Sequence, residues 1–261
     1  MSKVTYKTEE DIQQLRIAAD ILSRLLGEIA EEIKPGITTL SLDKFAHDYI
    51  QDHGGKPAFL GYHDFPFSLC ISVNDQIVHG FPSEYVIKEG DIVSVDGGVD
   101  YKGFISDSAY TFAIGEIAPE TRQLLDVTME SLNLGIAQAV AGKRVGDISS
   151  AVQDYVTQFG YGIVRELVGH GVGYKLHEKP DVPNYGKKGS GIKLEEGLVI
   201  CIEPMINLGR AGVKFWDDGW TVSTVDGKPS AHYEHMVVVR KGQPEVLTTF
   251  QHIENVLVKK S

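Results

Sequence analysis

The chain has 261 residues, of which 42% are hydrophobic and 23% are charged, which predicts a substantial core that needs no disulfide bonds. Its formal net charge of -11 argues against nonspecific binding to nucleic acid or acidic membranes. The N-terminus lacks an apolar signal core and no apolar stretch is long enough to span a bilayer, so we expect a cytoplasmic protein. Cys70 and Cys201 lie in apolar runs, which is typical of buried free thiols in a reducing compartment.

Two helices are expected at the start of the chain. Thr8, followed by three acidic residues, is typical of a helix N-cap, and apolar residues then recur every three or four positions over Ile12–Ile33. A Lys-Pro-Gly sequence ends this helix. Ser41 is predicted to cap a second helix that ends at Gly54, and strands follow from about residue 67 to about residue 115.

The second half of the chain repeats this order, with helices expected at 124–140 and 147–159. At a shift of 106 residues, Gly36 and Ser41 fall on Gly142 and Asp147, and at a shift of 107 residues 88–96 fall on 195–203. We therefore predict a diverged duplication within a single domain, 1–261, whose pseudo-symmetric halves cover roughly 8–115 and 116–240. The duplication makes Glu203 the counterpart of Asp96.

Asp96 and Asp107 flank a predicted hairpin. Alternating apolar runs at 92–95 and 108–112 predict two strands, and residues 100–103 predict the turn between them. If the hairpin folds about Tyr101 and Lys102, Asp96 lies directly opposite Asp107 on the same face. Like charges in that position are destabilising, so we expect a cation between the two carboxylates.

Two more acids lie in or beside apolar strands. A second strand pair is predicted from 220–225 and 231–239, and it carries Glu234 among apolar and aromatic residues. Glu203 follows another apolar run. His170 lies between glycines, which keep it out of a helix and let backbone segments approach closely.

Four carboxylates and one imidazole balance two divalent ions, with some acids bridging. Hard oxygen ligands with one imidazole suit Mn, Fe, Co or Zn, among which the sequence does not choose. A two-metal site can activate a bridging water and polarise a carbonyl. Taken singly, the two aspartates could be exposed acids on a hairpin, Glu203 could end a strand and His170 could be a structural hydrogen bonder. The candidate ligands are Asp96, Asp107, His170, Glu203 and Glu234.

This ligand order resembles the dinuclear site of methionine aminopeptidases, which share the pita-bread fold with Xaa-Pro peptidases. Three segments carry the same resemblance: G-H-G-V-G-Y-K-L-H-E-K-P, S-A-H-Y-E-H and V-N-D-Q-I-V-H-G-F-P. The resemblance extends from the first helix to Val239. It implies an α+β fold of internally duplicated helix-helix-sheet units around a curved antiparallel sheet. It also implies a single catalytic domain of the short, bacterial-like type 1 form.

The resemblance implies a role for each ligand. Asp96 would chelate one ion, and Asp107 and Glu234 would bridge both. His170 and Glu203 would complete the other ion, and Glu203 would also shuttle the proton of the attacking water. The free amine of the substrate would bind an ion, which restricts the reaction to N-terminal residues.

The resemblance also implies residues that bind the substrate. His177 would donate to the scissile carbonyl and its developing oxyanion, and His79 would contact the peptide nitrogen near the cleaved bond. A thioether side chain packs well against aromatic rings and sulfur, and the pocket positions are Tyr62, Phe65, Cys70, His79 and Trp220.

Three positions depart from the pattern of the family. Phe59 stands where related bacterial enzymes often carry cysteine, Leu176 stands where an aromatic residue is usual, and Leu167 replaces an aromatic residue or methionine. These changes leave the chemistry intact and alter the expected pocket shape. Four further histidines are expected on the surface: His47, His53, His232 and His252.

Two other functions share part of this pattern. An Xaa-Pro aminopeptidase or prolidase would use the same ligands, but such enzymes usually carry a large N-terminal domain, for which a first helix near Thr8 leaves no room. A non-catalytic pita-bread binding protein would typically lose ligands, and all five are present. We therefore expect removal of the initiator methionine from nascent polypeptide N-termini when the second residue is small. We also expect a monomer with transient ribosome association, no specific nucleic-acid sequence as partner and no membrane partner.

Overall fold

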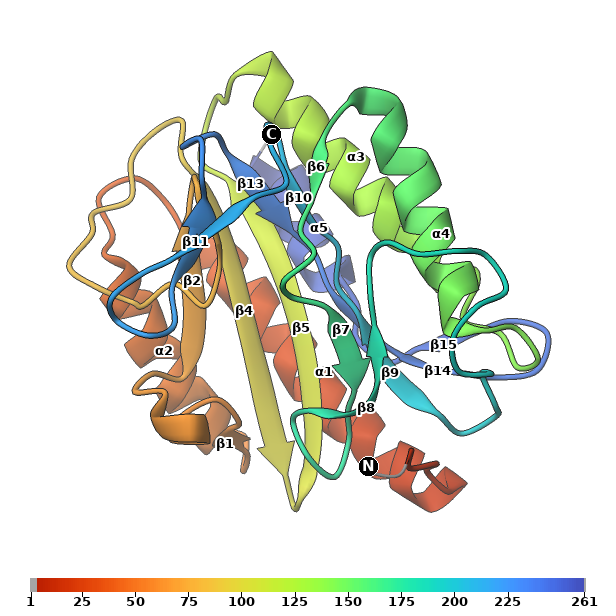
Figure 1. Ribbon diagram of the computed structural model, residues 1–261. Helices are drawn as coiled ribbons and strands as arrows, with labels where there is room; N and C mark the ends of the chain where they lie inside the picture. Colours follow the sequence, from red (N-terminus) through yellow and green to blue (C-terminus); the bar gives the residue numbers. More distant parts are fainter. Residues whose placement is uncertain (1–3, 261) are drawn as a thin grey trace.

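The structure is a computed structural model that describes residues 4–260 (Figure 1). Its α-helices are α1 (Glu9–Glu32), α2 (Thr39–Asp52), α3 (Pro119–Ile136), α4 (Val145–Val156) and α5 (Gln251–Lys260), with short 3-10 helices η1 (Tyr62–Asp64) and η2 (Thr157–Phe159). Its strands are β1 (Lys56–Pro57), β2 (Leu69–Val73), β3 (Gln76–Val78), β4 (Ile92–Tyr101), β5 (Phe104–Ala113), β6 (Gly162–Ile163), β7 (Gly169–Gly171), β8 (Glu178–Val182), β9 (Val199–Ile202), β10 (Met205–Asn207), β11 (Val213–Phe215), β12 (Val222–Thr224), β13 (Ser230–His232), β14 (His235–Val238) and β15 (Glu245–Val246).

Every pairing between these strands within residues 4–260 is antiparallel. The strands form four sheets, in the orders β1-β4-β2 with β5 on β4, β13-β10-β6, β11-β12-β3 and β15-β14-β9-β7-β8. An isolated bridge from Ala109 in β5 to Glu234, just before β14, links the sheets of the two halves. Helices combined with antiparallel sheets confirm the predicted α+β class.

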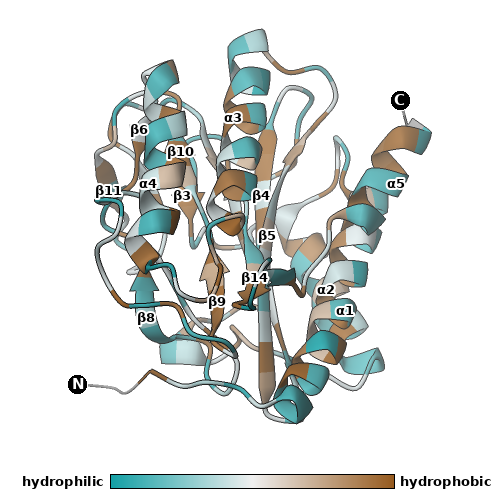
Figure 2. Cartoon of the chain, turned by 90° about the vertical axis from the view of Figure 1, so that its right-hand side faces the viewer, coloured by the Kyte–Doolittle hydropathy of each residue, from teal (hydrophilic) through white to brown (hydrophobic). Residues whose placement is uncertain are grey.

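The helices gather in two groups around the strands. Figure 2 shows α1, α2 and α5 lying together, apart from the pair α3 and α4. Helix α1 packs against β4, β5 and α5, whereas α3 contacts β9, β10 and β13. The colouring of Figure 2 separates β9, which is hydrophobic along its length, from the largely hydrophilic β8 at the sheet edge. The core therefore lies between the helices and the central strands.

The first helix confirms the sequence prediction. The Thr8 hydroxyl accepts a hydrogen bond from the Asp11 amide, and the Asp11 carboxylate accepts one from the Thr8 amide at 2.8 Å. This reciprocal capping box fixes the helix start. The periodic apolar face is buried, and Leu15 and Leu22 are fully inaccessible to solvent.

The predicted cap of the second helix was wrong by three residues. Helix α2 is capped by Thr38, whose hydroxyl accepts from the Ser41 amide at 3.2 Å. Ser41 is thus the third helical residue, and its own hydroxyl bonds back to the Thr38 carbonyl at 2.7 Å. The same offset holds in the second half of the chain, where Arg144 occupies the N-cap of α4 and Asp147 the third helical position. Three hydroxyl residues, Thr38, Thr39 and Ser41, lie close together in the sequence, which made the position of the cap ambiguous.

The β4–β5 hairpin has a different register from the predicted one. Asp96 pairs with Ala109, and Asp107 pairs with Gly98, so the aspartates are diagonal neighbours on one face rather than directly opposite. The turn centres on Lys102 and Gly103, which both have positive φ values of 55° and 87°. A two-residue turn of this kind matches the twist of the flanking strands and requires left-handed backbone at both positions, which glycine adopts without strain.

The predicted pairing of 220–225 with 231–239 was also wrong. Both segments form strands, but β12 pairs with β11 and β3, β13 pairs with β10, and β14 pairs with β9. The turn between them instead joins two sheets. The Asp226 carboxylate accepts from the Arg210 amide at 2.8 Å, which draws the turn toward the loop after β10.

Leu22 provides a test of the core. Replacing this fully buried residue by alanine leaves a cavity in a close-packed interior, so the free energy of unfolding should fall by about 2–5 kcal/mol. Urea denaturation followed by circular dichroism measures the change. Leu40→Ala makes the same substitution at a helical position that is 36% exposed and should cost less. Equal losses in the two variants would contradict the assigned packing of α1.

Candidate metal centre and substrate cavity

A cavity of about 110 Å³ opens beside β4, β5 and β7, and the structure brings every candidate site residue to its wall. Asp96 comes from β4, Asp107 from β5 and His170 from β7, while Glu203 follows β9 and Glu234 precedes β14. The remaining candidates on the wall are Tyr62, Phe65, Cys70, His79, His177 and Trp220. A water needs roughly 10–15 Å³ of such space, so the cavity has room for several heavy atoms of a side chain.

Three carboxylate oxygens in this cavity lack hydrogen-bond donors within the described residues. Asp107 and Glu234 are only 3% and 2% exposed, and one oxygen of each, together with Oδ1 of Asp96, is buried without a partner within the described residues. Burial raises the pKa of Asp96 to about 8. Burial and the neighbouring carboxylates raise the pKa values of Asp107 and Glu234 well above their ordinary range. Such a cluster is costly unless protons or cations neutralise it.

His170 presents a lone pair to these acids. Its Nδ1 donates to the Gly171 carbonyl at 2.9 Å, because a carbonyl can only accept. Burial, followed by the nearby His177, lowers the pKa of His170 to about 3, so the imidazole is neutral and Nε2 carries no proton. Nε2 lies 3.4 Å from Oε1 of Glu203 and 3.7 Å from Oδ2 of Asp107. Three acceptors that face one another in this way match the donor set of a metal ion.

The glycines around His170 allow the close approach that the sequence predicted. A Cβ atom at Gly169 would lie 2.4 Å from the Cys201 carbonyl oxygen, and one at Gly171 would lie 2.5 Å from the Lys179 carbonyl oxygen. Neither backbone oxygen can move away cheaply. Glycine on both sides therefore lets β7 fit between β8 and β9 and carry His170 into the cavity.

Sequence reasoning missed Cys201 as a neighbour of the acids. One ligand atom from each of Asp107, His170, Cys201 and Glu234 lies within 4.8 Å of the others. The Cys201 thiol hydrogen-bonds with Glu234, and burial raises the pKa of the thiol well above its ordinary value. Strand alternation gave a usable signal, since Cys201 and Glu203 are two residues apart and share a face. Both cysteines are buried free thiols, as predicted.

The prediction of a surface position for His232 was wrong. This residue ends β13, is 2% exposed and places Nε2 3.8 Å from Oε2 of Glu203. Neither of its ring nitrogens has a hydrogen-bond partner within the described residues, and burial lowers its pKa to about 3. A lone histidine in a short strand gave no sequence signal for this burial, which arises from pairing of β13 with β10.

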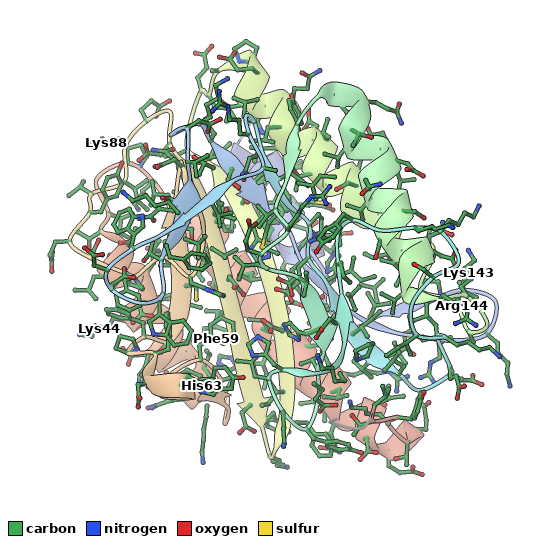
Figure 3. All side chains as sticks on the ribbon, in the orientation of Figure 1. Lys44, Phe59, His63, Lys88, Lys143 and Arg144 are labelled. Carbon is green, nitrogen blue, oxygen red and sulfur yellow. The ribbon has the colours of Figure 1, made fainter. Side chains whose placement is uncertain are left out.

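The opposite wall is apolar and aromatic. Phe59, Phe65, Cys70 and Leu176 form one buried cluster, and the Phe65 ring meets Trp220 edge-on at 5.0 Å. Figure 3 shows Phe59 and His63 on the same flank of β4, in the segment between β1 and β2. The departures at Phe59, Leu167 and Leu176 all line the cavity, so they shape the pocket directly.

Two histidines stand between the acids and this wall. The Nδ1 atom of His177 lies 2.7 Å from the Tyr62 hydroxyl. His79 faces Trp220 edge-on at 5.9 Å, and burial, followed by His177, lowers its pKa to about 4. Burial, followed by His63, also lowers the pKa of His177. Both rings are therefore neutral near pH 7. A neutral imidazole is suited to form a hydrogen bond with an uncharged peptide group.

Comparison with known proteins assigns the family. The sequence pattern of metallopeptidase family M24 matches residues 13–241. A methionine aminopeptidase from Clostridium perfringens is 49% identical over 94% of this chain and 98% of its own length. The crystal structure of methionine aminopeptidase from Rickettsia prowazekii matches with a TM-score of 0.93, at 37% identity, over 95% of this chain and all of that one. The chain therefore belongs to metallopeptidase family M24, and its α+β fold is the pita-bread fold of that family.

The Xaa-Pro alternative gains less from the same comparisons. Prolidase from Pyrococcus furiosus matches with a TM-score of 0.77, but at 24% identity and over only 65% of its own chain. This likeness shows the shared fold alone. The full-length relatives named above are methionine aminopeptidases. No helix within residues 4–260 is long and apolar enough to cross a membrane.

The unpaired acids predict an unusual pH dependence of stability in protein stripped of metal by a chelator. Because the folded state raises the pKa of Asp96 from 3.8 to about 8, its contribution to stability is largest at acid pH and is lost as the pH rises toward 8. The Tm should therefore fall between about pH 7.5 and about pH 9, an interval in which unfolded histidines, with an ordinary pKa of about 6.5, are also almost entirely neutral. Added Mn²⁺ should raise the Tm, and more so at the higher pH, since it replaces protons.

Thermal unfolding with and without Mn²⁺ measures both effects. Asp96→Asn, which lacks one of the acids, is the matched control and should show a smaller fall in Tm. A Tm of the chelated protein that rises over this interval would contradict the assigned burial of the carboxylates.

Proposed function

We propose that this chain is a metal-dependent methionine aminopeptidase that removes the initiator methionine from nascent polypeptides when the second residue is small. The observation that carries the proposal is a single cavity with unpaired acids and a neutral histidine on one wall and an apolar, aromatic pocket on the other. Similarity to methionine aminopeptidases over nearly the whole chain supports the same activity.

The metal site would consist of two divalent ions. Asp96 would hold one ion, His170 and Glu203 the other, and Asp107 and Glu234 would bridge both. The unpartnered carboxylate oxygens and the Nε2 lone pair of His170 support this assignment. Oxygen and imidazole donors suit Mn, Fe, Co or Zn. The ions would supply Lewis acidity toward the scissile carbonyl and a lower pKa for the attacking water.

Glu203 would take the proton of the attacking water and pass it to the leaving amine. Its side chain is 13% exposed and therefore lies at the cavity surface, unlike Asp107 and Glu234. Burial, followed by Asp107 and Asp96, raises its pKa well above the ordinary value of 4.5. A carboxylate with a raised pKa is a stronger base than an ordinary one, which suits it to accept and return a proton.

His177 would donate a hydrogen bond to the scissile carbonyl. Burial raises the pKa of Tyr62, so its hydroxyl keeps the proton, and we propose that it donates a hydrogen bond to Nδ1 of His177. The proton of the neutral imidazole is then on Nε2, the atom left to face the substrate. His79 would contact the peptide nitrogen near the cleaved bond.

The apolar wall would bind the methionine side chain through Tyr62, Phe65, Cys70, His79 and Trp220. Aromatic rings and a thiol favour a polarisable thioether. Phe59 and Leu176 fill positions on the same wall, so they would limit the length and branching of side chains that enter.

We further propose a cytoplasmic monomer, organised as a single catalytic domain with pseudo-symmetric halves at roughly 8–115 and 116–240, that meets nascent chains through transient ribosome association. Matching backbone conformations support the duplication. Gly36 and Gly142 have φ values of 96° and 98°, and Gly90 and Gly197 have values of 87° and 84°. The second helices of the two halves also begin at equivalent positions.

The proposed reaction is tested by hydrolysis of Met-Ala-Ser beside Ala-Pro-Ala. We expect release of methionine from the first peptide only, lost on chelation and restored by Mn, Fe, Co or Zn. Cleavage of only the proline peptide would assign the chain to Xaa-Pro peptidases. If neither peptide is cleaved with any of these metals, the result would favour a non-catalytic binding protein.

The proton-transfer role is tested by Glu203→Gln. Loss of a general base lowers the rate by about 100- to 10,000-fold, and we expect kcat for Met-Ala-Ser to fall in that range. Metal content, measured in parallel, separates this loss from loss of ions. Glu130→Gln, at an exposed position on α3, is the control and should retain activity. Near wild-type turnover in Glu203→Gln would exclude the role.

A further inference from the structure

The loop between β7 and β8 carries His177 and contacts the N-terminal segment of the chain. In Figure 1 the N-terminus lies beside this loop, below β8. Lys7 and Glu178 make the principal contact although 171 positions separate them in sequence. Neither residue lines the cavity described above.

Glu178 fastens the loop in two directions. Its Oε1 accepts hydrogen bonds from the backbone amides of Tyr174 at 2.8 Å and Lys175 at 3.0 Å, which folds the loop back on itself. Its Oε2 accepts from Lys7 Nζ at 2.6 Å and from the Thr5 hydroxyl. His177 immediately precedes Glu178, so its backbone is part of this closed loop.

The ion pair between Lys7 and Glu178 is buried. Their side chains are 1% and 7% exposed, respectively. Burial lowers the pKa of Lys7, and Glu178 opposes that effect; burial alone would raise the pKa of Glu178, but Lys7 and Thr5 lower it. Removing either partner would leave an uncompensated charge in the interior. Each side chain therefore has to stay beside the other.

The segment Thr5–Lys7, here called the N-terminal strap, is seated tightly. The Lys7 amide donates to the Gly197 carbonyl at 2.8 Å. A Cβ atom at Gly173 would lie 2.5 Å from Lys7 Cε, and a Cβ atom at Gly197 would lie 2.7 Å from the Lys7 carbonyl oxygen. At the far end of the loop, the Tyr174 hydroxyl donates to Asp11 in the first turn of α1 at 2.7 Å. The strap therefore binds the loop at Glu178, and α1 binds it at Tyr174.

We propose that Lys7 and Glu178 are positioning residues for the reaction, because their buried ion pair lets the N-terminal strap hold the backbone of His177 so that its ring faces the cavity. This inference rests on the proposed function. The strap holds the backbone while Tyr62 holds Nδ1 of the ring at 2.7 Å, so the imidazole is fixed at two points. A misplacement of about 1 Å can cost about 100-fold in rate.

Lys7→Met tests the strap because methionine keeps an unbranched apolar stem without the charge. We expect kcat for Met-Ala-Ser to fall by about 10- to 100-fold while KM changes much less, since His177 acts mainly on the transition state. Lys7→Arg retains the charge and should recover much of kcat. Hydrogen exchange of the Tyr174 and Lys175 amides should accelerate in Lys7→Met.

The matched control is Lys179→Met, which removes the neighbouring ion pair of Lys179 with Asp181. That pair lies one residue beyond Glu178, but its side chains are 45% and 56% exposed. Its loss should leave kcat and the exchange of the Tyr174 and Lys175 amides unchanged, as for most exposed pairs.

A double-mutant cycle with His177→Ala separates positioning from a general structural effect. If Lys7 acts through His177, Lys7→Met should lower kcat little further once His177 is alanine. The same fold-loss in both backgrounds would overturn the proposal, as would unchanged kcat in Lys7→Met. If Lys7→Met does not fold, Lys7→Met combined with Glu178→Gln removes both charges and is carried through the same cycle.

Wild-type activity keeps the two hypotheses apart. Methionine release by the wild type with unchanged kcat in Lys7→Met would reject the strap alone. A wild type that releases no methionine would reject the proposed function. In that case the proposal that the strap holds the loop would be tested by amide exchange alone. Unchanged exchange at Tyr174 and Lys175 in Lys7→Met would overturn that proposal as well.

Discussion

The mutual repulsion of buried carboxylates is the constraint on which the rest of the structure depends. Several acid groups face one cavity, one oxygen each of Asp96, Asp107 and Glu234 lacks a donor within the described residues, and burial together with neighbouring groups raises the pKa values of the acids. An isolated hairpin would relieve this cost by turning its acids toward water. Here that escape is closed because each acid comes from or borders a different strand, and moving one away would break a ladder of backbone hydrogen bonds. The fold thus maintains a cluster of acids that is favourable only when protons or cations neutralise it. The acids are Asp96, Asp107, Glu203 and Glu234.

Ala109 shows how the two halves of the chain are brought into register around this cavity. It pairs with Asp96 across the β4–β5 hairpin, and on its other side it forms the isolated bridge to Glu234, whose amide donates to the Ala109 carbonyl at 2.9 Å. One row of three residues therefore carries an acid from each half. In the neighbouring pair of strands, His235 of β14 pairs with Ile202 of β9. This antiparallel register brings Glu234, just before His235, next to Glu203, just after Ile202. A small residue at Ala109, fully buried, keeps the space between the acids open.

Sequence alone supplied what depends on local periodicity. Alternation along the hairpin put Asp96 and Asp107 on one face, and that conclusion survived an error in the turn, because the true register differs by an even number of residues. The turn itself depends on left-handed backbone at Lys102, for which lysine gives no signal. Burial of His232 follows from pairing between distant strands, which no local pattern encodes. The chain order of the ligands, in contrast, was informative because it matched a known family at every position.

Strained backbone conformations near the cavity indicate that the site is held in place by the surrounding fold. His63, Asp64 and His79 have φ values of 46°, 67° and 58°, a region that costs roughly 1–3 kcal/mol for such residues. The Thr221 hydroxyl donates its proton to Asp218 at 2.6 Å, and its oxygen lies 3.4 Å from the His79 carbonyl oxygen. Strand β3 on one side and this hydrogen-bonded turn on the other hold His79 in a conformation that it would leave in a free loop. The direction of its Cα–Cβ bond is then set by the backbone on both sides, which helps to fix a hydrogen-bonding group beside a reacting peptide.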